Sequence, residues 1–267
     1  LWALDRIGEP SLSPDGAQAV ASVTRHAMDT NRPQASLWLF STLGGEPRRL
    51  TEAGEKDGNP QWSPRGDLIA FTAKREQEGK KDGEAQLYVI APDGGEARRA
   101  ATVATGVESF RWFPDGKRLA FVSWVWPSLK TQAEQEKKLK EDKDDKVQAV
   151  VLEHNHYRHW DHWFARGRKP HIHVVDTVSG KVRDLFAGTA FHLPPQEPDA
   201  ALFDISPDSK ELVFTFDTNP DPREFSFTDI VAMDVKTGKT TLLTVRDKAL
   251  VRFAFEGPRY SPDGKYI

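Results

Sequence analysis

The sequence predicts an all-β protein made of repeated four-stranded sheets, and two observations carry this prediction. A proline-centred turn motif occurs five times, at Pro14, Pro64, Pro114, Pro207 and Pro262. Successive prolines are 50, 50, 93 and 55 residues apart, which is a repeat of about 50 residues with one insertion of about 43. A second landmark, a hairpin with a glycine turn, follows each of the first four motifs. Four strands in a repeat of this length are typical of propeller blades, so we expect a β-propeller.

The turn motif is clearest at Trp112–Gly116. Pro114 suits the first central position of a type I turn, while Asp115 supplies a side-chain hydrogen bond and Gly116 conformational freedom. The apolar run Leu119–Val122 that follows predicts a buried strand. The other copies of the motif are Leu12–Gly16, Trp62–Gly66, Ile205–Ser209 and Tyr260–Gly264.

The second landmark consists of an apolar strand, a glycine turn and a further strand. Its four copies span Leu37–Thr51, Leu87–Ala100, Ile172–Leu185 and Ile230–Leu243. The landmarks keep their register at a fixed period, which a β-sandwich does not require. Residues 1–255 therefore hold four blades, and Gly257–Ile267 begins a fifth.

Closed propellers need about 4–8 complete blades to hide their sheet edges. We therefore expect residues 1–267 to be a partial N-terminal propeller domain whose polypeptide continues beyond Ile267. Expressed alone, such a fragment should expose unpaired strand edges and associate or unfold.

Composition excludes several classes of function. The net charge is −3, so no global field favours nucleic acid or an anionic membrane, and no run of 18 apolar residues predicts a membrane span. The chain has no cysteine, which fits both the cytoplasm and the periplasm. It also has no Gly-x-Ser-x-Gly motif and no phosphate-binding glycine loop, so we expect no catalytic residue within it.

The insertion belongs to the third repeat, at about residues 127–153, where Pro127 ends the preceding strand. Lys130–Lys146 has 12 charged residues out of 17, with both signs mixed, which predicts a solvated helix or a disordered loop. The simpler interpretation is a charged excursion without direct chemistry. The functional one is a lid or arm that reaches toward a partner domain.

The insertion returns through a histidine-rich segment, and six of the eight histidines lie between His154 and His173. As one continuous strand, its even-numbered residues from His154 to His162 would share one face. One interpretation is a zinc site from His154, His156, His162 and Asp161. The spacing is not that of known zinc motifs, so we expect no metal and no cofactor.

Arg158, His159, Trp160 and Asp161 are the candidate substrate-binding residues. Arg158 and Asp161 offer charge, and Trp160 offers a wall for a side chain or a cation. The alternative is structural, with Arg158 and Asp161 paired and Trp160 packed between blades.

The repeated turns resemble the propeller of the prolyl oligopeptidase family of serine peptidases, and equally the periplasmic propeller of the Tol system. A more specific combination joins the charged insertion, the run Tyr157–Trp163 and the run Gly167–Val174. This combination resembles the dipeptidyl-peptidase V and acylaminoacyl-peptidase branch of the family, and the resemblance covers the whole chain as the N-terminal propeller only.

The resemblance implies a propeller placed over a downstream α/β-hydrolase domain that carries a Ser-Asp-His triad. The propeller would restrict access to short peptides, and the enzyme would release dipeptides or acyl-amino acids from their N-termini. The chain has no Glu-Glu dipeptide, the amine anchor of the dipeptidyl-peptidase IV branch, so an amine-binding carboxylate would come from elsewhere. Asp161 and Glu153 lie in the histidine-rich segment, and Asp161 is the candidate that we choose. Expected partners are short peptides, the hydrolase domain and a second copy in a homodimer. The alternative is a non-enzymatic periplasmic interaction propeller of the Tol type.

Overall fold

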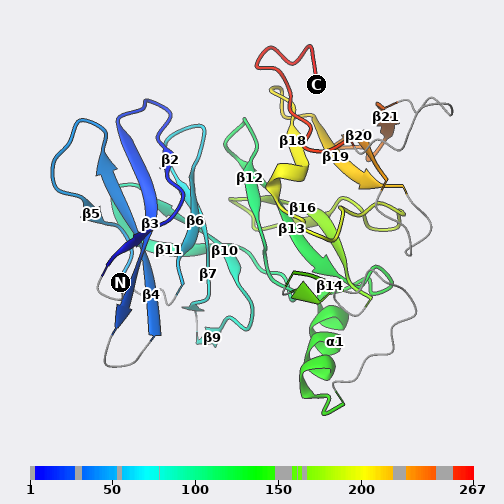
Figure 1. Cartoon of the computed structure of the whole chain (residues 1–267), viewed down its shortest axis with the longest axis horizontal. Helices are drawn as coiled ribbons and strands as arrows, with labels where there is room; N and C mark the ends of the chain where they lie inside the picture. Colours follow the sequence, from blue (N-terminus) through cyan, green and yellow to red (C-terminus); the bar gives the residue numbers. More distant parts are fainter. Residues whose placement is uncertain are drawn as a thin grey trace. The chain divides into compact units, whose positions relative to one another are not determined.

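The computed structural model confirms the predicted repeat of four-stranded sheets (Figure 1). It describes residues 4–27, 32–52, 56–77, 79–147, 158–160, 162–163, 167–218, 227–244 and 255–267. The chain forms two compact units, one of residues 1–119 with 175–182 and the other of residues 120–174 with 183–267.

The first unit contains the first two sheets. The first has the order β1-β3-β4-β5 with β2 also paired to β3, and its strands are β1 (Arg6–Ile7), β2 (Ser11–Leu12), β3 (Gln18–Ala27), β4 (Arg32–Ser41) and β5 (Arg48–Arg49). The second has the order β6-β7-β10-β11, with β6 (Gly58–Trp62), β7 (Ile69–Ala73), β10 (Gln86–Ala91) and β11 (Gly94–Ala101). Strand β1 and the short hairpin of β8 (Glu76–Gln77) and β9 (Lys80–Lys81) are additions that the repeat pattern did not predict.

The third and fourth sheets follow the same order along the chain. The third consists of β12 (Phe110–Trp112), β13 (Arg118–Val125), β16 (Lys169–Asp176) and β17 (Val182–Asp184). The fourth consists of β18 (Phe203–Ile205), β19 (Glu211–Asp217), β20 (Thr228–Asp234) and β21 (Thr240–Leu242), preceded by the 3-10 turn Ala200–Leu202.

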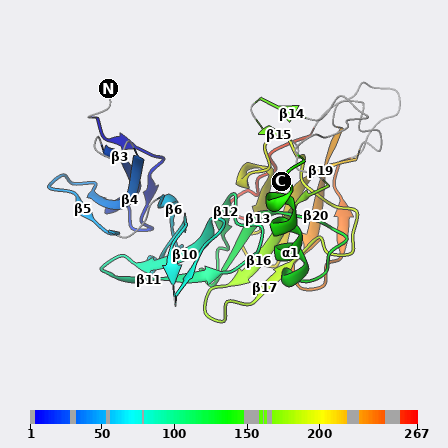
Figure 2. The same ribbon diagram turned by 90° about the horizontal axis from the view of Figure 1, so that it is seen from below.

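Residues 126–168, the β13–β16 excursion, leave the third sheet between its second and third strands. They include the helix α1 (Gln132–Asp144) and a two-stranded sheet of β14 (Arg158–His159) and β15 (His162–Trp163). Of the two forms expected for the charged segment, the helical one is therefore correct. The excursion also extends past residue 153, and Figures 1 and 2 show β13 and β16 side by side at its two ends.

All five proline-centred turns form as predicted. In each, the N–H of the fourth turn residue donates to the carbonyl of the first, over 2.8 to 3.0 Å. The fourth residue has a φ between +62° and +74°, a region that favours glycine, and in four copies it is glycine. Ser209 is the exception, with φ +62°. The Ser13 hydroxyl donates to Asp15 at 2.6 Å and accepts from the N–H of Gln18 at 2.9 Å, which closes the turn.

The two ends of each sheet differ. Because each sheet is an up-and-down meander, its first-to-second and third-to-fourth connections lie at one end and its second-to-third connection at the other. The first end carries the tight proline and glycine turns. The other end carries the β8–β9 hairpin in the second sheet and the β13–β16 excursion in the third.

The core of the first unit lies between its two sheets. It consists of Val20, Leu37, Leu39, Leu50, Trp62, Ile69, Phe71, Ala73, Tyr88, Ile90 and Ala97. Polar contacts near the start of each repeat tie these sheets together, since the N–H of Trp62 donates to the Ser11 hydroxyl at 3.0 Å.

In the second unit, the segment 255–267 repeats this arrangement against the fourth sheet. The N–H of Tyr260 donates to Asp204 at 2.9 Å, and the Tyr260 ring packs on Val213, Ile230 and Ala232. Among the described residues no helix is long and apolar enough to span a bilayer.

Candidate functional site

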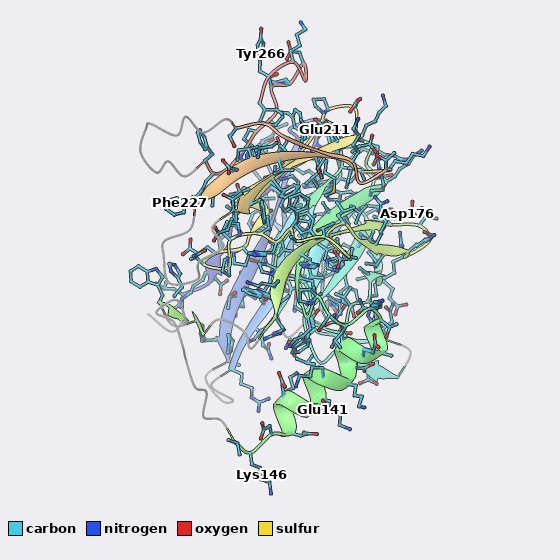
Figure 3. All side chains as sticks on the ribbon, turned by 90° about the vertical axis from the view of Figure 1, so that its right-hand side faces the viewer. Glu141, Lys146, Asp176, Glu211, Phe227 and Tyr266 are labelled. Atoms are coloured by element: carbon cyan, nitrogen blue, oxygen red, sulfur yellow. The ribbon has the colours of Figure 1, made fainter. Side chains whose placement is uncertain are left out.

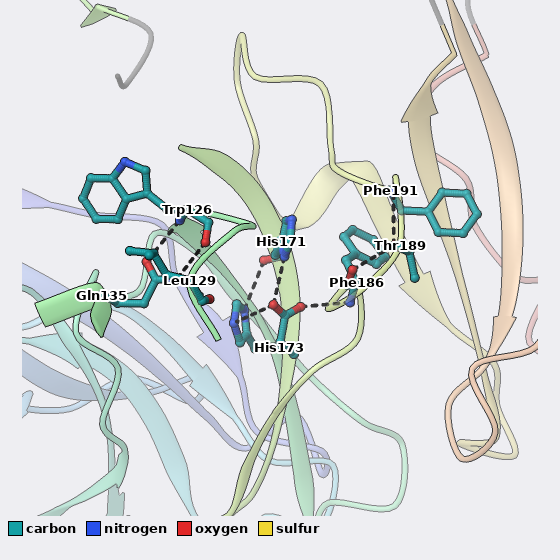
Figure 4. A network of polar contacts seen from close by, with 9 residues as sticks. Trp126, Leu129, Gln135, His171, His173, Phe186, Thr189 and Phe191 are labelled. Carbon is teal, nitrogen blue, oxygen red and sulfur yellow. Dashed lines mark hydrogen bonds and ion pairs between the residues drawn. The ribbon is translucent and has the colours of Figure 1, made fainter. Parts of the chain in front are cut away.

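The β13–β16 excursion begins at Trp126, and the helix α1 is fastened to that point. The Gln135 side chain accepts from the N–H of Trp126 at 3.1 Å and donates to its carbonyl at 2.9 Å (Figure 4). A third bond reaches the Leu129 carbonyl at 3.2 Å. Gln135 is 4% exposed, so this amide replaces water for two main-chain groups at the end of β13. The returning chain meets the same residue, because the Arg168 guanidinium lies 5.4 Å from the centre of the Trp126 ring.

The helix α1 itself is polar on all sides, and Gln135 is its buried residue. Its start is fixed by a capping box, in which the Thr131 hydroxyl accepts from the N–H of Glu134 at 3.2 Å and the Glu134 carboxylate accepts from the N–H of Thr131 at 2.9 Å. Figure 3 shows Glu141 on the helix and Lys146 beyond its C-terminal end. Local capping and the Gln135 contacts therefore help to hold a helix that has no apolar face.

The described part of the histidine-rich segment does not have the continuous strand geometry considered above. Arg158 pairs with Trp163 and His159 with His162, so the chain reverses between them and forms the β14–β15 hairpin. The reversal passes through Trp160, whose φ is +49°. Strand alternation assumed an extended backbone throughout, and the left-handed conformation of one residue ends that alternation.

The hairpin presents Trp160 to solvent. Its side chain is 80% exposed, and its ring lies edge-on to the His159 ring with centroids 6.3 Å apart. His159 Nε2 lies 3.4 Å from a carboxylate oxygen of Glu197, in the connection between the third and fourth sheets. The hairpin therefore brings an exposed indole, an imidazole and a carboxylate together. Glu197 was not among the residues singled out from the sequence.

The other predicted site residues can be placed only in part. The backbone of Arg158 lies in β14, whereas its side chain and all of Asp161 are outside the described residues. His154, His156 and Glu153 are also outside them, so the interpretations that involve these residues stay predictions. Within the described ranges, no group of three or more His, Cys, Asp or Glu side chains is arranged to hold a metal ion.

A second polar cluster lies where the excursion rejoins the sheet. His171 and His173 occupy one face of β16, and each is 2% exposed. Nδ1 of His171 donates to Oδ2 of Asp184 at 2.9 Å, and Nε2 of His173 lies 3.8 Å from the same oxygen (Figure 4). The other carboxylate oxygen, Oδ1, accepts from the N–H of Phe186 at 2.9 Å.

The surroundings of this cluster are aromatic. The His173 ring stacks on Phe121, with centroids 5.2 Å apart and planes 16° from parallel. His171 meets Phe186 edge-on at 5.7 Å, and Phe186 packs against Phe214 at 4.7 Å.

Burial lowers the pKa of His173, because the charged imidazolium would lose its water. Burial alone would raise the pKa of Asp184, but the hydrogen bond from His171 and the nearby imidazoles hold this pKa below its ordinary value. At neutral pH the cluster is therefore a carboxylate beside a neutral His173.

This cluster could have been recognised from the repeats. Matching backbone bonds from Leu50 to Leu37 and from Leu185 to Ile172 show that the hairpins are in the same register. In that register Asp184 takes the position of Arg49, opposite the third strand. A carboxylate at this position, facing two alternate histidines, was the available signal. It does not reveal that both imidazoles are buried.

Comparison with known proteins gives structural matches alone. No family model and no curated protein matches the chain. The uncomplexed acylaminoacyl peptidase of Pyrococcus horikoshii matches with a TM-score of 0.61 and 17% identity, over 90% of this chain and 32% of that one. The β-propeller domain of the trilobed protease from Pyrococcus furiosus matches with a TM-score of 0.54 and 16% identity, over 91% and 58%.

An oligogalacturonate lyase in complex with manganese also matches, with a TM-score of 0.55 and 16% identity, over 97% of this chain and 60% of that one. The chain thus spans about a third of the acylaminoacyl peptidase and three fifths of the other two proteins. Since two of these proteins are named as peptidases and the third as a lyase, the likeness identifies the architecture and not the chemistry. The sheets and these matches together show that the chain has a β-propeller fold.

Proposed function

We propose that this chain is the substrate-recognition propeller of a serine peptidase that releases dipeptides or acyl-amino acids from the N-termini of short peptides. The catalytic triad would lie in an α/β-hydrolase domain of the same polypeptide. The fold likeness to an acylaminoacyl peptidase and to a protease propeller agrees with this proposal.

The observation that carries the proposal is the exposed Trp160 on the β14–β15 hairpin. A non-glycine residue with φ +49° costs about 1–2 kcal/mol relative to its usual conformations. Such strain is concentrated at functional sites, where the surrounding structure enforces it. The Trp160 indole is 80% exposed although its backbone is strained, and ligand binding explains this combination better than packing does.

In the proposed site, Trp160 supplies the wall against which a substrate side chain packs. His159 is held by Glu197 and orients the hairpin, while Arg158 and Asp161 supply the charges that bind the peptide ends. Asp161 is our choice for the carboxylate that accepts a free α-ammonium group.

The proposal is tested with the full-length protein that contains this chain, on dipeptidyl and acyl-amino-acid reporter substrates. We expect Trp160→Ala to raise KM about tenfold with little change in kcat, since losing uniform binding of about 1.4 kcal/mol has that effect. The matched control is Leu43→Ala, which removes an apolar side chain that is also largely exposed, 94%, outside the excursion. Asp161→Asn should raise KM for free-amine substrates and spare blocked ones.

Two results would reject the proposal. One is a polypeptide without a Gly-x-Ser-x-Gly motif within about 200–300 residues after Ile267, roughly the size of a further domain. The other is a full-length protein with no peptidase activity that keeps protein partners at high salt. The latter result would favour the alternative, a non-enzymatic interaction propeller of the Tol type.

A further inference from the structure

One oxygen of Asp184 faces two buried imidazoles at unequal distances. His171 binds Oδ2 at 2.9 Å, whereas Nε2 of His173 stays 3.8 Å away from it. The difference between these two distances follows from which imidazole nitrogens carry a proton. A carboxylate and a main-chain carbonyl can only accept, so Nδ1 of His171 carries the proton shared with Asp184, and Nδ1 of His173 carries the proton donated to the His171 carbonyl at 3.3 Å.

A neutral His173 therefore turns the lone pair of Nε2 toward a carboxylate oxygen, and no hydrogen bond forms. If Nε2 gains a proton, the same nitrogen becomes a cationic donor aimed at that oxygen. Charge-assisted bonds between imidazolium and carboxylate are about twice as strong as neutral ones. His173 would then compete with His171 for Oδ2 of Asp184.

We propose that His171, Asp184 and His173 form a proton-driven switch at the point where the β13–β16 excursion rejoins its sheet. In the neutral state Asp184 joins His171 to the backbone of Phe186. When His173 takes up a proton at Nε2, Asp184 moves toward it, and the bonds to His171 and Phe186 lengthen.

The charged groups around the cluster are consistent with this exchange. Asp184 of β17 and His171 of β16 act on His173, and the neighbouring strand β13 contributes the uncharged Phe121 ring. His192, on the connection after β17, is influenced by Lys169, Asp217 and His171. Burial lowers the pKa of both His173 and His192, so the unfolded chain binds more protons than the folded one. The stability that these histidines contribute is complete above their ordinary value of 6.5 and falls as the pH drops below it.

If the bond between Asp184 and the N–H of Phe186 lengthens, the change can be transmitted to the excursion through the connection that follows β17. The Phe186 carbonyl accepts from the Thr189 hydroxyl at 2.8 Å, and the N–H of Leu193 donates to the Pro170 carbonyl at 3.0 Å. Pro170 precedes His171 in β16 and lies two residues after the end of the excursion. Acid would thus alter how the β14–β15 hairpin is held. The switch does not depend on the proposed function, and only its effect on substrate binding does.

The test is amide hydrogen exchange of the full-length protein at about pH 7.5 and about pH 5.5, with the rates corrected for the intrinsic pH dependence of exchange. These two pH values are chosen because histidine is the side chain that ordinarily changes its charge between them. We expect exchange in peptides covering 184–193 to be faster at the lower pH, by up to about tenfold, because a drop of about two pH units raises the ratio of protonated to neutral His173 about a hundredfold. His173→Gln should abolish this difference, and His26→Gln, in another sheet, should retain it.

The proposal is overturned if the wild-type protein shows no acid-induced increase in residues 184–193, or if His173→Gln shows the same increase. Far-UV circular dichroism at the higher pH checks that the variants fold. If His173→Gln does not fold, Asp184→Asn replaces it, because an amide keeps an acceptor for His171 while removing the charge that attracts His173. An acid response that persists in Asp184→Asn also overturns the switch.

Discussion

Arg98, in the fourth strand of the second sheet, donates from Nη1 to the carbonyl oxygen of Thr177 in the hairpin of the next sheet, over 2.6 Å. Two further pairs make the same contact, Arg48 with the Pro92 carbonyl and Arg183 with the Lys236 carbonyl. The arginines occupy equivalent repeat positions, since Arg48 pairs with Leu39 in the sheet and Arg98 with Val89. In the fourth sheet Thr241 holds this position. The contact is thus a repeated link between consecutive blades.

We expect Arg98→Ala to lower the free energy of unfolding by about 1.5 kcal/mol, because hydrogen bonds from charged groups contribute roughly 1.5–3 kcal/mol and this one is partly buried. Urea unfolding of the wild-type and variant proteins measures the change. Arg183→Ala is the control, since its bond is exposed and 3.2 Å long, and we expect a loss of about 0.5 kcal/mol or less. Equal losses for the two variants would contradict the importance of burial.

The proline-centred turns offer a matched pair of glycines. An added Cβ at Gly116 would lie 2.6 Å from both Cγ and Cδ of Arg65, whereas at Gly16 it would meet nothing within 4 Å. Both glycines have a positive φ, so either alanine variant should cost about 1–2 kcal/mol from backbone strain. Gly116→Ala should cost about 1 kcal/mol more, because Arg65 must move. Thermal denaturation of both variants decides this, and equal melting temperatures would show that Arg65 yields without cost.

The anchor of α1 can be removed by one substitution. Gln135→Ala removes the side-chain bond to the N–H of Trp126 and one of two bonds to its carbonyl, which also accepts from the N–H of Leu129 at 2.9 Å, so we expect a loss of about 1–3 kcal/mol. We expect the helix to detach and its lysines to be cleaved by trypsin about tenfold faster, in line with local opening. Lys140→Ala, on the exposed surface of the same helix, should leave cleavage at the remaining lysines unchanged. An unaltered digestion rate in Gln135→Ala would mean that the helix is held by other contacts.

Acid should weaken the proline-centred turns over a defined pH range. The hydroxyls of Ser13, Ser206 and Ser261 lower the pKa of Asp15, Asp208 and Asp263, together with backbone N–H groups. The unfolded chain therefore binds more protons near pH 4, so the contribution of these aspartates is complete above the ordinary value of 3.8 and is lost as the pH falls through the lower, folded values. We expect the melting temperature of Asp208→Asn to fall less steeply than that of the wild-type protein below about pH 4. Parallel curves would contradict this linkage.

The blade repeat could be predicted because its signals are local. Pro114 and Gly116 specify a turn within four residues, and the same turn recurs at a fixed interval, so neither tertiary contacts nor relatives were needed. The charged helix was anticipated for a similar reason. Its anchor was not, because a lone Gln135 among charged residues looks solvated, and its burial depends on the strand end that it meets.

The candidate site was only partly predictable. The pattern singled out residues 158–161, but alternation could not show that the chain reverses at Trp160, because a left-handed tryptophan has no sequence signature. Glu197 lies 38 residues from His159, and the distance between them depends on the tertiary fold. Likewise, His171 and Asp184 are recognisable as a pair only after the repeats are aligned and the burial of the imidazoles is known.

The separation of tight turns and long connections at opposite ends of each sheet has a consequence for how such a chain can diversify. The β13–β16 excursion adds 43 residues without removing a strand from the third sheet, because its two ends return to neighbouring strands. Lengthening a connection of this kind costs only about 0.6 kcal/mol per doubling. The same end of the other sheets is therefore suited to grafted segments. In the fourth sheet, the N–H of Thr218 donates to the Phe227 carbonyl at 2.8 Å, so the end of β19 is bonded to the start of β20. A new recognition loop could be attached at this pair of strand ends.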